Sequence, residues 1–170
     1  VATLKKKLDW GYEPFEVPEE VFKHCKKFAN KGRRAQRAWK NMFKAYAEKY
    51  PELAKEYAVW YSDELPVDLL ADEDFWKDEG DIATRATSEK VLQKVAKVVP
   101  NLFGGSADLA PSNKSLMKDR EYYSKENPAG SNIHFGIREF AMTAMANGMA
   151  VHGGVRPYIA GFYVFADYMK

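Results

Sequence analysis

Apolar side chains recur every three or four residues over most of the first sixty positions, which is the spacing of one face of an α-helix. Two prolines in residues 12–18 exclude a helix there. Pro18, Glu19 and Glu20 are typical of a helix start, because carboxylates are favourable near the positive end of the helix dipole. We expect helices that begin at Glu19, Arg33 and Glu52, with the first ending near Asn30-Lys31-Gly32 and the second before Pro51.

From residue 81 onward, short apolar runs alternate with helical patterns. Leu102-Phe103 followed by Gly104-Gly105 predicts a short buried strand that enters a tight turn. We expect further strands at residues 133–135 and 157–161, a helix from a Thr87 or Ser88 cap to Pro100, one over residues 137–152 that Gly153-Gly154 ends, and one beginning near Phe162. Helices between short strands predict an α/β fold, a partial parallel sheet with flanking helices, preceded by a helical linker region.

The acidic segment of residues 62–80, with Pro66 and Gly80, is typical of a connection between domains. We therefore divide the chain into residues 1–70 and residues 71–170. The last nine residues form an apolar pattern without a terminating Gly or Pro, so we expect the chain to be part of a longer polypeptide.

The chain has 170 residues, 46% of them hydrophobic and 29% charged, with a net charge of +2. This is the composition of a globular protein and excludes a fibrous repeat or a disordered tail. The single cysteine, Cys25, excludes a disulfide framework within the chain, and the three scattered histidines match no Cys/His zinc spacing. With no export signal and no apolar run of roughly 20 residues, we expect a cytoplasmic protein without a membrane partner.

Basic residues are concentrated in the first predicted helices, with no acid between Val21 and Ala47. Apolar positions occupy one helical face and the charges the other, which favours a solvated surface over a nucleic-acid site. We therefore expect no nucleic-acid partner; the alternative would show as salt-sensitive binding. The basic side chains are Lys23, Lys26, Lys27, Lys31, Arg33, Arg34, Arg37, Lys40 and Lys44.

The most informative polar run follows the first predicted strand. Ser106, Asp108 and Ser112 would lie at the carboxyl edge of the sheet, where open α/β sheets bind ligands. The alternative is a tight turn in which Asp108 caps a neighbouring helix.

Glu139 lies in the first turn of a helix that is rich in small residues and that we expect to be buried. A buried carboxylate needs a partner, which can be Arg138, the helix amides or a nitrogen base on a ligand. Three aromatic side chains recur at three-residue spacing, a pattern typical of core unless they face the same cleft as Glu139. They are Phe162, Phe165 and Tyr168.

Three runs carry a family resemblance: Asn101-Leu-Phe-Gly-Gly-Ser-Ala-Asp-Leu-Ala-Pro-Ser-Asn113, Ile133-His-Phe-Gly-Ile-Arg-Glu-Phe-Ala-Met142 and Ala146-Asn-Gly-Met-Ala150. The chain resembles a transketolase. Because residues 8–18 and 38–51 also match, the resemblance covers almost the whole chain. It implies the end of the diphosphate-binding domain and the linker in residues 1–70, and the first part of the pyrimidine-binding domain in residues 71–170.

The resemblance implies a thiamine diphosphate enzyme of the pentose phosphate pathway. Such an enzyme moves a two-carbon ketol unit from a ketose phosphate to an aldose phosphate. It also implies a homodimer whose active sites lie between the subunits. The divalent metal, magnesium or calcium, would be bound by the diphosphate-binding domain outside these residues, so this segment holds no metal.

Residue roles follow from the matched positions. Glu139 would hydrogen-bond N1′ of the cofactor's aminopyrimidine and share its proton, which favours the imino tautomer that removes the thiazolium C2 proton. Asp108 and Leu109 match positions beside the thiazolium ring, and Arg85 and Ser112 match positions that hold the substrate phosphate. The aromatic pocket around the pyrimidine matches Phe162, Phe165 and Tyr168.

Some family features are absent from these residues. The Gly-Asp-Gly motif for metal and diphosphate does not occur in the sequence, and neither do the family's upstream and downstream histidines. We therefore expect the segment alone to be inactive. Two alternatives remain: a dihydroxyacetone synthase-like relative, which would prefer formaldehyde to ribose 5-phosphate as acceptor, and a truncated non-catalytic homologue that acts as an interaction module.

Overall fold

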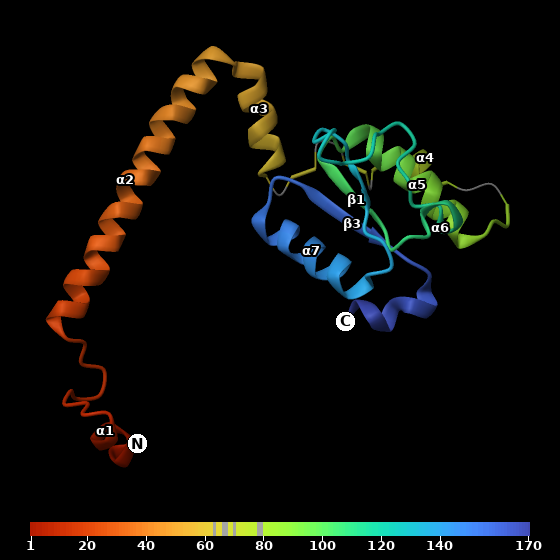
Figure 1. Cartoon of the computed structure of the whole chain (residues 1–170). Helices are drawn as coiled ribbons and strands as arrows, with labels where there is room; N and C mark the ends of the chain where they lie inside the picture. The colour runs from red at the N-terminus through yellow and green to blue at the C-terminus, as the bar shows by residue number, and fades with distance from the viewer. Residues whose placement is uncertain (63, 66–67, 70, 78–79) are drawn as a thin grey trace. The chain divides into compact units, whose positions relative to one another are not determined.

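The computed structural model describes residues 1–62, 64–65, 68–69, 71–77 and 80–170. It divides into two compact units, Val1–Ala54 and Lys55–Lys170. Figure 1 labels helices α1 to α7 and strands β1 and β3. The predicted connection at residues 62–80 and the predicted division after residue 70 fall partly on residues outside these ranges.

The first unit consists of helices, as the pattern predicted. A short helix α1, Ala2–Lys7, precedes α2, Glu19–Lys49, which is a single continuous helix (Figure 1). The predicted break near Gly32 is wrong. A glycine inside a helix costs only about 1 kcal/mol relative to alanine, and the helical pattern of apolar and basic positions continues through it. All nine basic side chains of residues 23–44 are exposed.

Two further helices come before the sheet. Helix α3, Pro51–Trp60, begins at the proline that ends α2, since proline fits the first turn of a helix. Helix α4, Glu73–Trp76, is capped by the side chain of Asp72, which accepts from the Phe75 amide at 3.1 Å. The Lys94 ammonium donates to the Phe75 carbonyl and so ties α4 to the following helix.

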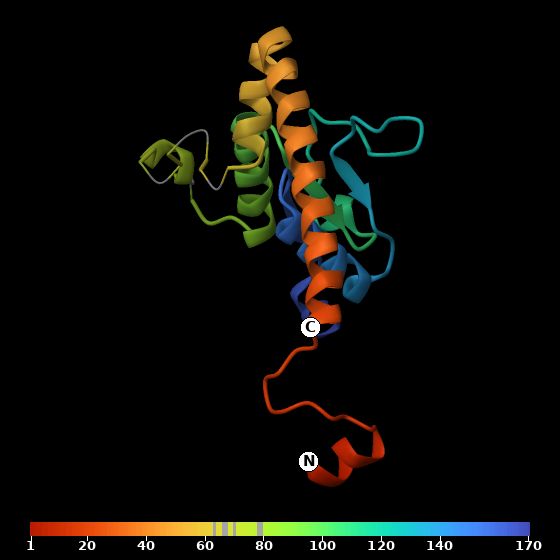
Figure 2. The ribbon, with the colours of Figure 1, turned by 90° about the vertical axis from the view of Figure 1, so that its left-hand side faces the viewer.

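The second unit is built on three parallel strands, which confirms the predicted α/β fold. The strands are β1, Leu102–Ser106, β2, Asn132–His134, and β3, Arg156–Ala160, in the order β2-β1-β3. β1 is therefore central, and β2 is an edge strand at the side of the unit in Figure 2. Because all three strands run in the same direction, their carboxyl ends lie at one edge of the sheet.

The predicted Gly104-Gly105 turn is wrong, because both glycines lie within β1. Gly104 pairs with Asn132 on one side and Tyr158 on the other. A Cβ at Gly104 would overlap the backbone and ring of Tyr158, whose hydroxyl lies 3.3 Å from the Asn132 side-chain oxygen on β2. Glycine is required here because a tyrosine side chain from β3 crosses the central strand.

Two helices cover opposite faces of the sheet. Helix α5, Thr84–Val98, packs in a cluster with Leu102 and Tyr158, whereas helix α7, Glu139–His152, packs in a second cluster with Ile159. Tyr158 and Ile159 are adjacent in β3 and so point to opposite faces. Figure 1 shows α5 and α7 on either side of β1 and β3. Helix α7 ends at Gly153 with a positive φ of 80°, as predicted.

Two details of these helices differ from the prediction. α5 begins at Thr84 with Ala83 as its N-cap, so Thr87 and Ser88 lie inside the helix rather than at a cap. α7 is not a buried helix: only Met142 and Ala146 are buried, Met149 packs against the same core cluster as Met142, and Phe140, Met145 and Val151 are exposed. Several of the small residues of α7, such as Ala144 and Gly148, are therefore exposed in this chain.

The segment between β1 and β2 is attached to the sheet by two polar side chains. Asn132 is 1% exposed and uses its whole amide: its nitrogen donates to the Met117 and Arg120 carbonyls, and its oxygen accepts from the Met117 amide. The Arg120 guanidinium donates to four carbonyls around the end of α5 and the start of β1, those of Ala96, Val99, Pro100 and Leu102. Burial lowers the pKa of Arg120 and raises that of Tyr158.

Gly104→Ala tests the crossing of the central strand. Because the new methyl group overlaps Tyr158, we expect the free energy of unfolding to fall by about 3 kcal/mol or more. Urea denaturation of the chain, followed by circular dichroism, measures the change. Gly148→Ala in α7 is the control, since its Cβ meets nothing within 4 Å, and it should stabilise the chain by about 0.5–1 kcal/mol. Equal stability of the two variants would contradict the assignment.

Candidate functional site

A cavity of about 730 Å³ opens at the carboxyl ends of β1 and β3. Arg85 from α5, Asn113 from the turn after β1, and Phe162 after β3 line it. The Arg85 guanidinium donates to the Ser112 carbonyl at 3.3 Å. The structure therefore brings together Arg85, Ser112 and Phe162, three of the predicted site residues that are distant in sequence.

The turn after β1 holds Asp108, Leu109 and Ser112. It includes helix α6, Ala110–Asn113. Asp108 has a φ of 73°, in the left-handed region that non-glycine residues rarely adopt. Its carboxylate does not cap α6, the helix that follows it, because α6 has Leu109 at its N-cap and no side-chain cap. All three side chains are exposed, so the turn presents them at the sheet edge.

Glu139 is the first residue of α7 and is half-buried. Among the residues that the structure describes, its carboxylate has no hydrogen-bond or ion-pair partner. The predicted alternative of a pair with Arg138 is wrong, because that guanidinium donates to the Phe135 carbonyl at 2.9 Å. Glu139 does not line the cavity beside Arg85. Its carboxylate lies in the first turn of α7, where the helix dipole favours a negative charge, and is available to a ligand.

The three aromatic side chains lie at the C-terminal end of the chain. Phe162 precedes the 3-10 helix η1, Tyr163–Met169, whose three residues per turn place Phe165 and Tyr168 on one side. Phe165 is 37% and Tyr168 65% exposed, so the stripe is not core in this chain. Met169 of η1 packs instead against the cluster that contains Met142 of α7. Contact between η1 and α7 thus places the aromatic stripe on an element next to the helix that begins with Glu139.

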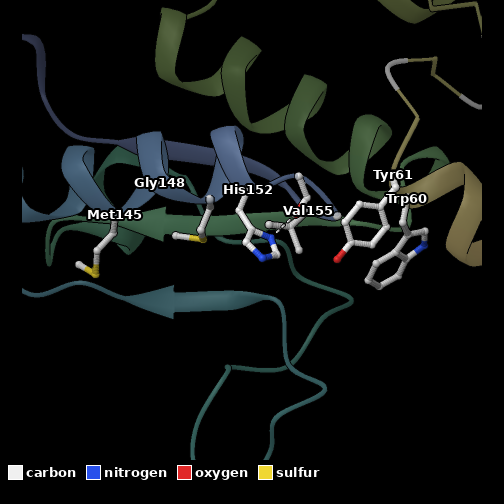
Figure 3. Close-up of a pocket in the computed structure, with 9 residues that line it drawn as sticks. Trp60, Tyr61, Met145, Gly148, His152 and Val155 are labelled. Atoms are coloured by element: carbon white, nitrogen blue, oxygen red, sulfur yellow. Dashed lines mark hydrogen bonds between the residues drawn. The ribbon is translucent and has the colours of Figure 1, made fainter. Parts of the chain in front are cut away.

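A second cavity, of about 640 Å³, lies at the opposite end of α7 (Figure 3). Figure 3 shows Met145, Gly148 and His152 in a row along α7, with Trp60 and Tyr61 beside its last turn. None of the predicted site residues line it. Since none of them lines it, and His152 at its far end lies thirteen positions after Glu139, about 20 Å at 1.5 Å per residue, this cavity is distinct from the predicted site.

Sequence reasoning missed a buried polar network behind the turn. The Asn113 amide donates to the Ser106 hydroxyl at 2.6 Å and accepts from the Ser115 hydroxyl at 2.6 Å. All three side chains are buried. The sequence contains a signal for it: polar residues on both sides of an exposed turn, one of them at the end of an apolar strand.

The described part of the chain contains no group of three His, Cys, Asp or Glu side chains that could hold a metal ion. Among the helices that the structure describes, none is long and apolar enough to cross a membrane.

One carboxylate beside the turn has a perturbed pKa. Hydrogen bonds from Lys118 and then Lys114 lower the pKa of Glu89 below its usual value of 4.5. The ammonium nitrogens lie 2.8 Å and 3.0 Å from its two oxygens. Because Lys114 follows Asn113 directly, these ion pairs tie the end of the turn to α5.

Family models match both parts of the chain. Residues 80–170 match the pyrimidine binding domain of transketolase. Residues 1–66 match the thiamine diphosphate binding domain of transketolase.

Known proteins of the same kind match the chain over most of its length. Transketolase of Staphylococcus epidermidis is 46% identical over 95% of this chain, and transketolase 2 of Escherichia coli is 42% identical over all of it. A crystal structure of the Pichia stipitis transketolase complex with sedoheptulose-7-phosphate covers 96% of the chain with a TM-score of 0.81 and 33% identity. The chain spans 25% and 26% of the two relatives and 26% of that structure.

Glu89→Gln tests the ion pairs beside the turn. Since the pairs lower the pKa of Glu89, they stabilise the fold fully above its ordinary value and lose this effect as the pH falls through the lowered value. We expect the Tm of the chain to exceed that of the variant by about 1–3 °C at pH 7, and the difference to disappear as the pH falls through the lowered pKa of Glu89. Thermal unfolding at several pH values measures it. Glu126→Gln, at an exposed loop carboxylate, should leave the Tm unchanged; a constant difference at all pH values would refute the pairing.

Proposed function

Because this chain belongs to the transketolase family, we propose that it supplies part of an active site that transfers a two-carbon ketol unit between sugar phosphates. The observation that carries the proposal is Glu139: a half-buried carboxylate at a helix start, without a partner among the described residues. Thiamine diphosphate, when bound, would supply the carbanion chemistry and the electron sink that ketol transfer requires.

Glu139 would hold a proton at the ring nitrogen N1′ of the cofactor's aminopyrimidine. The residues fit this role, since the carboxylate is fixed by α7 but not engaged by Arg138. A flat heteroaromatic ring also needs apolar side chains to stack against. Exposed aromatic rings on η1 and on α7 can provide them: Phe165, Tyr168 and Phe140. Phe162, which lines the cavity beside Arg85, would be a further aromatic side chain next to the ring.

Asp108 and Leu109 would lie beside the thiazolium end of the cofactor. The turn presents both at the carboxyl edge of the sheet, and the left-handed backbone of Asp108 sets where its carboxylate projects. Backbone strain at an exposed polar residue is retained where the surrounding structure imposes it, which is common at ligand sites.

Arg85 and Ser112 would bind the phosphate group of the substrate. A guanidinium suits a phosphate because its donors form a planar fork, and a serine hydroxyl adds another donor. Two observations support this: Arg85 lines the cavity, and its guanidinium donates to the carbonyl of Ser112, the residue before the cavity-lining Asn113. The N-terminus of α5, which has no side-chain cap, lines the same cavity and adds a favourable dipole.

The remaining components would come from outside these residues. The diphosphate and a divalent metal, magnesium or calcium, would be bound by the part of the diphosphate-binding domain that lies outside these residues, so the segment alone would show no turnover. A homodimer would complete the site, because the exposed apolar face of α7, with Val151 90% and Phe140 70% exposed, suits burial against a second subunit. The reaction would take place in the cytoplasm as part of the pentose phosphate pathway. We place the domain division after residue 70, between the two matched ranges.

Glu139→Gln tests the role of the carboxylate. An amide cannot share a proton with N1′, so hydrogen–deuterium exchange at C2 of bound thiamine diphosphate should slow by at least about 100-fold. Nuclear magnetic resonance of the complete gene product with added cofactor measures the exchange rate. Glu126→Gln is the control and should exchange at the wild-type rate. Unchanged exchange in the Glu139 variant would remove this residue from the mechanism.

Arg85→Gln tests the phosphate site. Loss of the guanidinium should raise the KM of the complete gene product for ribose 5-phosphate by about tenfold or more, because charge-assisted hydrogen bonds are the stronger class. The kcat/KM for ribose, which has no phosphate, should stay the same. Lys97→Gln at an exposed site of the same helix should change neither value. A loss of the same size for both acceptors would show that Arg85 does not bind the phosphate.

A further inference from the structure

We propose that Asn113 is a positioning residue whose buried amide holds the turn after β1 in place and so aligns Ser112 and Arg85 for the substrate phosphate. This inference rests on the proposed phosphate site. It concerns a residue that lines the same cavity but is only 9% exposed, and whose amide is fully engaged by its neighbours.

The amide of Asn113 connects two separate anchors. Its nitrogen donates to the hydroxyl of Ser106, and its oxygen accepts from the hydroxyl of Ser115, each at 2.6 Å. Both groups of the amide are engaged, and both serines are buried. A buried polar network in which every group has a partner fixes one geometry, because any rearrangement leaves a group unsatisfied.

Both anchors are themselves held by the sheet. Ser106 is the last residue of the central strand and pairs with His134 and Ala160 on its two sides. The Ser115 carbonyl accepts from the Tyr158 hydroxyl of β3 at 2.9 Å. Through Ser106 and Ser115, Asn113 therefore fixes the turn to the two strands β1 and β3.

The turn transmits this position to the phosphate site. The amides of Ser112 and Asn113 both donate to the Leu109 carbonyl, at 3.0 Å and 2.9 Å, so the residues move as one unit. The Ser112 carbonyl in turn accepts from Arg85. A shift of Asn113 would displace the serine hydroxyl and the group that orients the guanidinium together.

An amide is the side chain that this position requires. Leucine has a similar volume but neither donates nor accepts, so it would leave the Ser106 and Ser115 hydroxyls buried without partners. Ser115→Ala removes one arm of the network and keeps the backbone bond to Tyr158, which makes it a milder change.

The experiment compares Asn113→Leu and Ser115→Ala with Asn101→Leu in the complete gene product. Asn101 is a matched control: its buried amide donates to the Gly154 carbonyl at 3.2 Å, but it precedes β1 at the opposite end of the strand. Two quantities are measured, the KM for ribose 5-phosphate and its dissociation constant by titration calorimetry without a donor substrate. The kcat/KM for ribose and the Tm are recorded in parallel, and Arg85→Gln serves as the reference for a lost phosphate contact.

We expect Asn113→Leu to raise both the KM and the dissociation constant for ribose 5-phosphate by about tenfold, and Ser115→Ala by about threefold. The kcat/KM for ribose should be unchanged. Asn101→Leu should lower the Tm by a similar amount and leave both constants as they are. If Asn113→Leu does not fold, the KM and the dissociation constant of Ser115→Ala for ribose 5-phosphate test the inference.

Two results would overturn the inference. If Asn113→Leu and Ser115→Ala behave like Asn101→Leu while Arg85→Gln weakens ribose 5-phosphate binding, Asn113 is only structural and the proposed phosphate site stands. If Arg85→Gln also leaves binding unchanged, the phosphate site itself is wrong and the positioning role falls with it.

Discussion

The crossing of Tyr158 over Gly104 to reach Asn132 is the constraint on which the rest of the second unit depends. It joins all three strands in one row, with the tyrosine hydroxyl 3.3 Å from the asparagine oxygen. A shift of any strand by one residue would turn these side chains to the other face of the sheet. Since every candidate site residue from Asp108 onward follows a strand end, the register of this row determines where the site lies.

The proposed phosphate site consists of exposed side chains that would contact the ligand and of buried side chains that fix the backbone of the turn. Arg85 is exposed and lines the cavity, and Ser112 is exposed beside it, whereas Asn113 lines the same cavity but is buried and fully hydrogen-bonded. This division is physically necessary. A group that binds a phosphate must exchange its water for the ligand, but the backbone that carries it must not move when the ligand arrives, so its supports have to be inside the protein.

The sequence predicted the architecture better than the roles of individual glycines and caps. Alternation of short apolar runs with helical patterns was sufficient for a parallel sheet, and Gly153 ends α7 as expected. The prediction for Gly104 was wrong because this glycine leaves space for Tyr158 rather than forming a turn. Tyr158 lies on a strand more than fifty residues away, so local sequence does not show this requirement. Asn113 was missed for a related reason: polar residues around the turn are a signal for a buried network, but only the folded turn shows that the Asn113 amide joins Ser106 to Ser115.

The surroundings of Glu139 supply only part of what its proposed role in catalysis requires. Its position at the start of α7 supplies a favourable helix dipole, but the carboxylate is only half-buried and the apolar side chains near it, including Phe140, face solvent. In water a proton shared between a carboxylate and a ring nitrogen gains little, since water competes for both partners. The same contact becomes strong once another surface covers those apolar side chains and excludes water. In the proposed mechanism, the residue that would start the chemistry and the surface that would make it effective come from different parts of an assembled protein, which is the arrangement that the proposed homodimer would supply.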